Sequence, residues 1–220
     1  MARLNPKVAR QVGIKKQNLG KVIIFCEGTT EANYFNYFAN HFKRNKYSEI
    51  EIVCEKANGN AQTVLDHANE FLDKDSNISF YSNWGKYLVF DCDDPDNIQE
   101  VMMKMIESDR DYKLFLSNYL FETWLLMHFE IVEEKLKKAK IYNKMADYLR
   151  VEKYNSKVKA DKGIMAKIIG DLQPVRYAIE NARSLEEKYK SEGLSVKSDI
   201  DKMNPYTTVH KLMEEILSEI

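Results

Sequence analysis

The sequence predicts an α/β fold, in which a mostly parallel sheet is flanked by helices and followed by a helical C-terminal extension. Three observations lead to this prediction. Over residues 21–130, short apolar segments rich in β-branched residues alternate with segments whose apolar residues recur at helical spacing. From residue 131 onward the pattern is helical only. The chain has 220 residues, of which 44% are hydrophobic, so it can bury a sizeable core.

The first strand and helix organise the rest of the chain. Residues 22–25 are apolar and predict a buried strand, which ends at Glu27. A helix is expected from Glu31 onward, because aromatic residues recur there at helical spacing: Tyr34, Phe35, Phe38 and Phe42. Glu27 is therefore expected at the carboxyl end of a strand, where open α/β sheets keep their binding sites.

The other elements of the α/β part follow in order. We expect strands at 50–54, 87–90 and 112–116, and helices at 64–72, 98–106 and 121–129. The loop before the second of these strands carries Phe80, Tyr81 and Trp84, which we interpret as a hydrophobic cover, with a base-stacking surface as the alternative.

The extension is expected to contain helices at about 133–149, 162–171, 174–190 and 207–219. A turn at 204–208 with a threonine cap precedes the last of them. His128 and His210 are interpreted as packed or capping residues within helices. The chain as a whole is expected to have three parts, which are a basic arm at 1–20, the α/β domain at 21–130 and the helical extension at 131–220, packed on that domain.

Composition limits the class of protein. No run of about 18 apolar residues and no signal-peptide pattern is visible, so we expect a cytoplasmic protein without a membrane partner. The three cysteines, Cys26, Cys54 and Cys92, have no metal-binding spacing and are expected to be reduced. The net charge of −1 hides basic segments at 1–21 and 131–170 around an acidic centre at 91–122. This pattern suits a metal site on a polyanion-binding surface, although ordinary solvated helix faces would give it as well.

Two strand ends carry the candidate chemistry. Glu27 follows the first strand, and Asp91 and Asp93 follow the strand at 87–90. If the strands are parallel neighbours, these carboxylates emerge at the same edge of the sheet and repel one another unless a cation lies between them. Oxygen ligands without a His or Cys cluster favour Mg²⁺ or Mn²⁺. Asp-x-Asp after a strand also suits phosphatases, glycosyltransferases and receiver domains, and Asp94 and Asp96 fit helix caps.

Together these residues resemble a known fold and family. The apolar strand, Glu27-Gly28, the helix and Asp91-x-Asp93 resemble the Toprim fold of topoisomerases, primases and overcoming-lysogenization-defect (OLD) nucleases. The additional acid Glu31, one helical turn after Glu27, makes the pattern more similar to the OLD nucleases than to the other Toprim proteins. The further motifs resemble the RloB family, also called the AbiLii abortive-infection family, from about residue 21 to the end. They are Gly59-Asn60-Ala61, Ser117-Asn118, Phe121-Glu122-x-Trp124-Leu125-Leu126-x-His128-Phe129-Glu130 and Asn204-Pro205-Tyr206-Thr207-Thr208-Val209-His210.

The resemblance implies a Toprim-like nuclease of prokaryotic phage defence. By position, Glu27, Asp91 and Asp93 would form the metal and acid/base set, with Glu31 assisting. Glu122 would hold a second cation. The alternative is that Glu122 is an exposed acid in the first turn of a helix. The helix dipole alone also accounts for Glu31.

One basic residue completes the predicted site. Phosphodiester hydrolysis requires an activated water and stabilised charge on the leaving oxygen, which Mg²⁺ or Mn²⁺ ions can supply. A lysine is also expected to stabilise the pentavalent phosphorus. Lys162, at the start of a helix in the basic second half, is the candidate, and a surface lysine among basic neighbours is the alternative.

The expected partners are nucleic acid, either DNA or RNA with tRNA as one option by analogy, and an ABC/OLD-like ATPase that the family resemblance implies. A homodimer is included among the candidate assemblies.

Two rival functions remain open. One is another Mg²⁺-dependent phosphoryl hydrolase built on Asp91 and Asp93, and the other is a non-catalytic Toprim-like partner of the ATPase.

Overall fold

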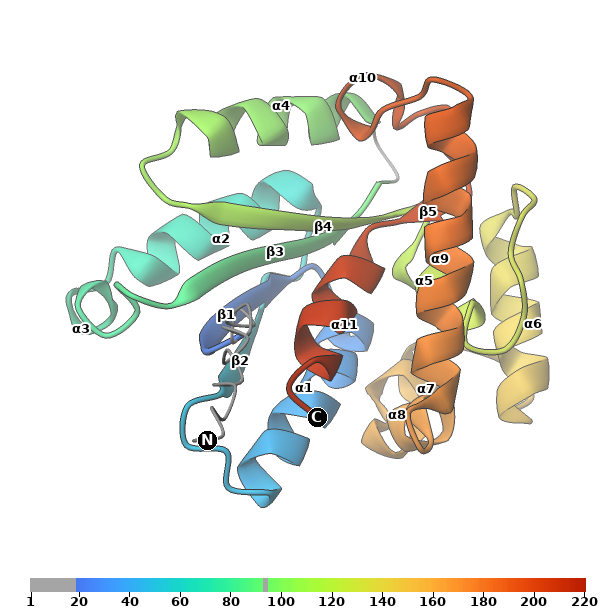
Figure 1. Cartoon of the computed structure of the whole chain (residues 1–220), viewed down its shortest axis with the longest axis horizontal. Coiled ribbons are helices and arrows are strands. Elements are labelled where there is room, and N and C mark those ends of the chain that lie inside the picture. Colours follow the sequence, from blue (N-terminus) through green and yellow to red (C-terminus); the bar gives the residue numbers. More distant parts are fainter. Residues whose placement is uncertain (1–18, 93–94) are drawn as a thin grey trace, which may run out of the picture.

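Five strands form the central sheet, in the order β2-β1-β3-β4-β5 (Figure 1). A computed structural model describes residues 19–92 and 95–220. The strands are β1 (Lys21–Cys26), β2 (Glu51–Lys56), β3 (Gly85–Asp91), β4 (Tyr112–Asn118) and β5 (Tyr206–Thr207). The first four are parallel, and β5 pairs antiparallel with the end of β4. The prediction of a mostly parallel sheet flanked by helices is therefore confirmed, while Asp93 and the arm up to residue 18 lie outside the described residues.

Strand β1 lies between β2 and β3. After β1 the chain forms β2 on one side of it, and it then crosses to the other side to form β3. In the register Cys26 lies beside Val89, which brings the residues after β1 next to the last residues of β3. In open α/β sheets a reversal of strand order of this kind opens a crevice at the carboxyl ends of the strands. This crevice is where the sequence places Glu27 and Asp91.

Helices cover both faces of the sheet. They are α1 (Thr29–Arg44), α2 (Ala61–Leu72), α3 (Asp75–Ile78), α4 (Pro95–Glu107), α5 (Phe121–Leu126), α6 (Lys138–Leu149), α7 (Ser156–Ala160), α8 (Lys162–Ile169), α9 (Gln173–Ser191), α10 (Val196–Asp199) and α11 (Val209–Leu217). Figure 1 shows α2 and α4 over one face and α1 and α11 over the other. The helices α6 to α9 lie on the side of the strands' carboxyl ends, beside the crevice. Among the described helices, none combines the length and apolarity needed to cross a membrane.

An aromatic core joins α1 to α5. The Tyr34 ring packs against Phe121, Trp124 and His128. His128 is buried, with Nδ1 3.0 Å from the carbonyl oxygen of Trp124 and Nε2 3.1 Å from the Tyr34 hydroxyl. Burial lowers the pKa of His128 to about 4. His128 is therefore a packed core residue, as predicted, and it holds the helix that carries Glu122 against α1.

The extension differs from the prediction at its end. The helix expected from residue 207 begins at Val209, and Tyr206–Thr207 instead form β5. The Thr207 side chain is fully buried, and its hydroxyl donates to the carbonyl oxygen of Leu116 at 3.1 Å and lies 3.0 Å from the Ser117 hydroxyl. The extension is thus not helical only, because it contributes the last strand of the sheet.

The aromatic loop after α2 forms α3 and a turn. Trp84 is buried, and the rings of Tyr81 and Phe80 lie 4.9 and 5.6 Å from it between centroids. Phe80 itself is 57% exposed. The loop therefore packs on itself and, through Tyr81, on the Phe71 ring of α2 at 5.5 Å between centroids.

Candidate functional site

Glu27 and Asp91 are joined by a hydrogen bond at the crevice. Glu27 directly follows β1, and its main-chain N–H donates to the carbonyl oxygen of Val89 at 3.2 Å, which continues the β1–β3 ladder. Its carboxylate Oε2 then accepts the main-chain N–H of Asp91 at 3.0 Å. The predicted meeting of the two strand ends is therefore observed for these two acids.

Asp91 carries an unsatisfied oxygen. Its Oδ1 atom is buried and has no hydrogen-bond partner among the described residues. Burial raises the pKa of Asp91 well above its usual range, and the charges of three neighbouring glutamates add to this effect. A buried carboxylate with a free oxygen is stabilised by a proton or by a cation.

Glu31 adds a third carboxylate from the first turn of α1. It is buried, with 5% of its surface exposed. Burial raises the pKa of Glu31 to about 8, and the charges of Glu122 and Glu27 contribute to the rise. The helix dipole accounts for an acid at this position but not for its burial among other acids. Gly28 leaves room for the Glu31 carboxylate, because a Cβ at position 28 would lie 3.1 Å from Oε2 of Glu31.

Glu122 is the fourth carboxylate, in the first turn of α5. It is 2% exposed, so the interpretation as an exposed helix acid is wrong. Its Oε1 atom lies 2.7 Å from Nζ of Lys159 and accepts a weak hydrogen bond of 3.4 Å from the Thr30 hydroxyl. Glu122 thus has a cationic partner within the chain.

Lys159 comes from α7, a helix of five residues that the sequence pattern did not predict. Burial lowers its pKa, but the Glu122 carboxylate outweighs that effect and the pKa is raised overall. Its ammonium also donates to the Tyr142 hydroxyl at 2.7 Å and lies 4.6 Å from the centre of that ring. A helix this short has no apolar periodicity, so only the basic composition of 131–170 pointed to a lysine here.

Lys162, the predicted lysine, lies elsewhere. It is exposed at the start of α8 and does not line the pocket that the four acids share. Asp161 caps this helix by accepting the main-chain N–H of Gly163 at 2.8 Å. The structure therefore brings Lys159 rather than Lys162 to the acids.

The acids line one pocket of about 300 Å³. Lys138 and Tyr142 of α6 and Lys159 of α7 form its other wall. The chemistry of the donors fits Mg²⁺ or Mn²⁺, because all are carboxylate oxygens and one buried oxygen lacks a partner. Within residues 19–92 and 95–220, however, no three His, Cys, Asp or Glu side chains are already arranged to hold a metal ion. Asp93, the remaining predicted ligand, lies outside these residues.

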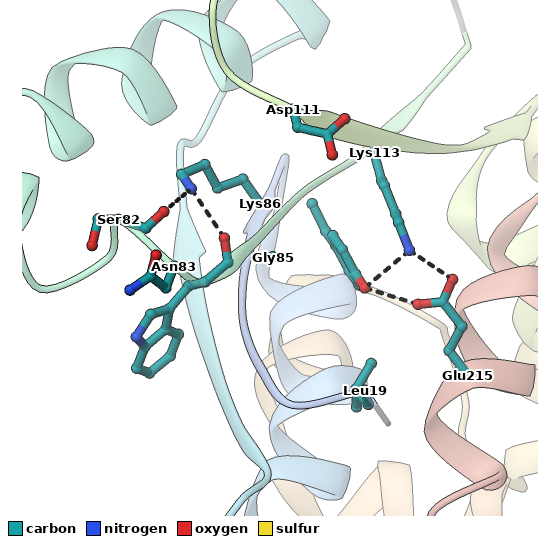
Figure 2. A pocket seen from close by; sticks show the side chains of 10 residues that line it. Leu19, Ser82, Asn83, Gly85, Lys86, Asp111, Lys113 and Glu215 are labelled. Atoms are coloured by element: carbon teal, nitrogen blue, oxygen red, sulfur yellow. Dashed lines mark hydrogen bonds and ion pairs between the residues drawn. The ribbon is translucent and has the colours of Figure 1, made fainter. Parts of the chain in front are cut away.

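A second pocket, of about 400 Å³, lies at the opposite edge of the sheet (Figure 2). Two of its charged side chains, Lys113 and Glu215, form an ion pair. Glu215 accepts hydrogen bonds from Lys113 at 3.0 Å and from the Tyr87 hydroxyl at 2.8 Å. The Lys86 ammonium donates to the carbonyl oxygens of Ser82 and Trp84. This pocket contains no concentration of like charge, so the acidic pocket is the better candidate site.

Comparison with known proteins agrees with the motifs. No curated protein and no solved structure matches the chain. The family model described as "RloB-like protein" matches residues 22–216, which include β1 from Val22 onward, the four acids, Lys159 and β5. Because this match covers nearly the whole chain, the protein belongs to the RloB-like family.

Proposed function

We propose that the protein is a metal-dependent nuclease that hydrolyses phosphodiester bonds of DNA or RNA, with Mg²⁺ or Mn²⁺ as its cofactor. The observation that carries the proposal is the meeting of Glu27, Asp91 and Glu31 in one pocket at the reversal of strand order. On the side of Asp91, one buried carboxylate oxygen has no hydrogen-bond partner among the described residues. A divalent cation is the simplest group that stabilises such a set.

Each acid has a proposed role. Glu27 and Asp91 would hold the cation, together with Asp93. The bound ion would supply an activated water and stabilise charge on the leaving oxygen. Glu31, with a pKa of about 8, holds a proton near neutral pH and can release it when a cation lowers that pKa, which suits a general acid or base. These roles would need no large movement of the sheet, since Glu27 and Asp91 are already joined by a hydrogen bond.

The surroundings of the pocket suit a polyanionic substrate. Lys138 and Lys159 line the pocket with the acids, and Lys56 donates a hydrogen bond of 3.2 Å to Thr29, another lining residue. Lysines that line the same pocket as a carboxylate-bound cation could contact the phosphates on either side of the cleaved bond. Binding of nucleic acid should then weaken steeply as salt is added.

One rival function has a specific observation in its favour. The described residues contain no ready group of three metal ligands, which favours a non-catalytic partner of an ABC/OLD-like ATPase. That rival predicts no cleavage of any nucleic acid in the presence of Mg²⁺ or Mn²⁺. A phosphatase, the other rival, predicts turnover of a small phosphate ester that Asp91→Asn abolishes and Glu27→Gln spares.

The test uses the purified chain with total cellular RNA, single-stranded DNA and plasmid DNA, each with Mn²⁺ and with EDTA. We expect Mn²⁺-dependent products from one nucleic acid class, and none from Glu27→Ala. p-Nitrophenyl phosphate serves as the probe for the phosphatase. Absence of products from every pool, with and without an ATPase encoded beside the gene, would contradict the proposal.

The family resemblance supports the biological setting of the proposal. We propose that the protein acts in anti-phage defence by abortive infection, in the cytoplasm and together with such an ATPase. A homodimer is also compatible with this role.

A further inference from the structure

Lys159 holds a fixed position inside the acidic pocket. Its ammonium lies 2.7 Å from Glu122 Oε1 and 2.7 Å from the Tyr142 hydroxyl. The ammonium also lies 4.6 Å from the centre of the Tyr142 ring and 5.5 Å from that of Tyr154. An ammonium enclosed by a carboxylate, a hydroxyl and two aromatic rings is bound much as a free cation would be.

The backbone around Lys159 is fixed from two sides. The Asn155 side chain caps α7 by accepting the main-chain N–H groups of Lys157 and Val158. From α1, the Asn33 amide donates a hydrogen bond of 2.9 Å to the carbonyl oxygen of Lys159. The extension therefore presents this lysine to the pocket at a set place, and α1, which also carries Glu31, holds it there.

The pairing sets Glu122 apart from Asp91. Glu122 has its charge compensated by Lys159 at 2.7 Å. The Asp91 carboxylate instead has a buried oxygen, Oδ1, without a hydrogen-bond partner among the described residues. A further cation would therefore stabilise the Asp91 carboxylate, whereas the Glu122 carboxylate already has a cationic partner.

We infer that the Lys159 ammonium takes the place of a second cation at Glu122, and that the pocket binds one divalent cation rather than two. The inference rests on the proposed function for the presence of a cation, and it adds the number of ions and the residue that sets this number. A positive charge a few ångströms from Glu122 repels a divalent ion from that carboxylate, and in a buried site this repulsion is little screened. Removing the charge should open the position.

Mn²⁺ binding measured by isothermal titration calorimetry tests the inference without any activity assay. The wild type should bind one Mn²⁺ per chain, and Lys159→Met should bind two. Lys159→Met combined with Glu122→Gln should return to one, because the second position then lacks its carboxylate. Lys157→Met is the matched control, since it removes an exposed lysine from the same helix and should leave one site.

Two further variants keep the test decisive if Lys159→Met does not fold. Lys159→Gln is neutral but can still donate a hydrogen bond to Glu122, and it should also bind two Mn²⁺. Glu122→Gln alone should leave the affinity of the single site within about threefold, because Glu122 is not a ligand of that ion.

Three results would overturn the inference. They are two Mn²⁺ per wild-type chain, one Mn²⁺ in both neutral variants of Lys159, or a loss of tenfold or more in Mn²⁺ affinity in Glu122→Gln. A wild type that binds no Mn²⁺ would overturn the inference and the metal-dependent part of the proposed function together. One ion in the wild type and two in Lys159→Met, without cleavage of any nucleic acid, would contradict only the nuclease.

Discussion

The main-chain N–H of Asp91 donates a hydrogen bond of 3.0 Å to Oε2 of Glu27. This bond joins the last residue of β3 to the first residue after β1, across the point where the strand order reverses. It orients the Glu27 carboxylate along the edge of the sheet, toward the pocket that Asp91 and Glu31 share. The two acids are therefore positioned by the backbone of the sheet and not by a mobile loop.

This bond predicts different stabilities for two variants of Glu27. Glu27→Gln keeps a carbonyl oxygen that can accept the Asp91 N–H, so its free energy of unfolding should stay within about 0.5 kcal/mol of the wild type. Glu27→Ala leaves the N–H without its acceptor and should lose about 1–2 kcal/mol. Urea denaturation followed by circular dichroism checks both values. Equal losses in the two variants would show that the bond contributes nothing.

Lys159→Met should destabilise the chain in the absence of metal. It leaves the Glu122 carboxylate, 3% exposed, without its cationic partner. Removing one partner of a buried pair costs about 3–5 kcal/mol, and the 23% exposure of the Lys159 side chain reduces the expected loss to about 2 kcal/mol. Lys157→Met should change the free energy of unfolding by less than about 0.5 kcal/mol. A loss in Lys159→Met no larger than in this control would mean that the ion pair does not contribute to stability.

The metal-free chain should become less stable as the pH rises. The pKa of Glu31 is about 8 in the folded chain and 4.5 in its ordinary state, so between these values the folded chain binds more protons than the unfolded chain. Stability linked to this proton is complete below about pH 4.5 and is lost as the pH rises through 8. The thermal midpoint in EDTA should therefore fall over this range, and Glu31→Gln should flatten the slope. A midpoint that rises in the wild type and in Glu31→Gln alike would contradict this prediction.

Thr207→Val should weaken the attachment of the extension to the sheet. The buried hydroxyl donates to the Leu116 carbonyl oxygen and accepts the main-chain N–H of Val209 at 3.1 Å. Replacing it by a methyl group of similar volume leaves the main-chain N–H of Val209 unpaired and should cost about 2 kcal/mol, although the Leu116 carbonyl oxygen still accepts the main-chain N–H of Thr208 at 2.9 Å. Thr207→Ser keeps the hydroxyl and should lose less. Equal stability of Thr207→Val and the wild type would show that β5 is not held by this side chain.

The sheet and half of the site could be predicted from the sequence because they depend on local pattern. Parallel strands that are buried on both faces have continuous apolar sequences, so the sequence shows where β1 and β3 end. These strand ends predict that Glu27 and Asp91 lie close together. The first-turn position of Glu31 followed from the aromatic spacing of α1. These features need no knowledge of how distant segments meet.

The other half of the site depends on contacts between distant segments. Lys159 lies on a helix of five residues and reaches Glu122, 37 positions earlier in the chain, through the docking of α7 on α1. Neither this docking nor the burial of Glu122 leaves a periodic signal in the sequence, so the sequence pattern favours Lys162, at the start of a longer helix, and does not indicate Lys159. The same holds for β5, whose two residues are too few to show the alternation of a strand.

Cleavage by Glu27→Gln tests the central claim most directly. The variant keeps the fold and removes one negative charge from the pocket, and Glu55→Gln makes the same change in the neighbouring strand β2, outside the pocket. With Mn²⁺ and the nucleic acid class that the wild type cleaves, we expect Glu27→Gln to cleave at least about 100-fold more slowly and Glu55→Gln to match the wild type. Cleavage by Glu27→Gln within about threefold of the wild-type rate would contradict the assignment of this pocket as the active site.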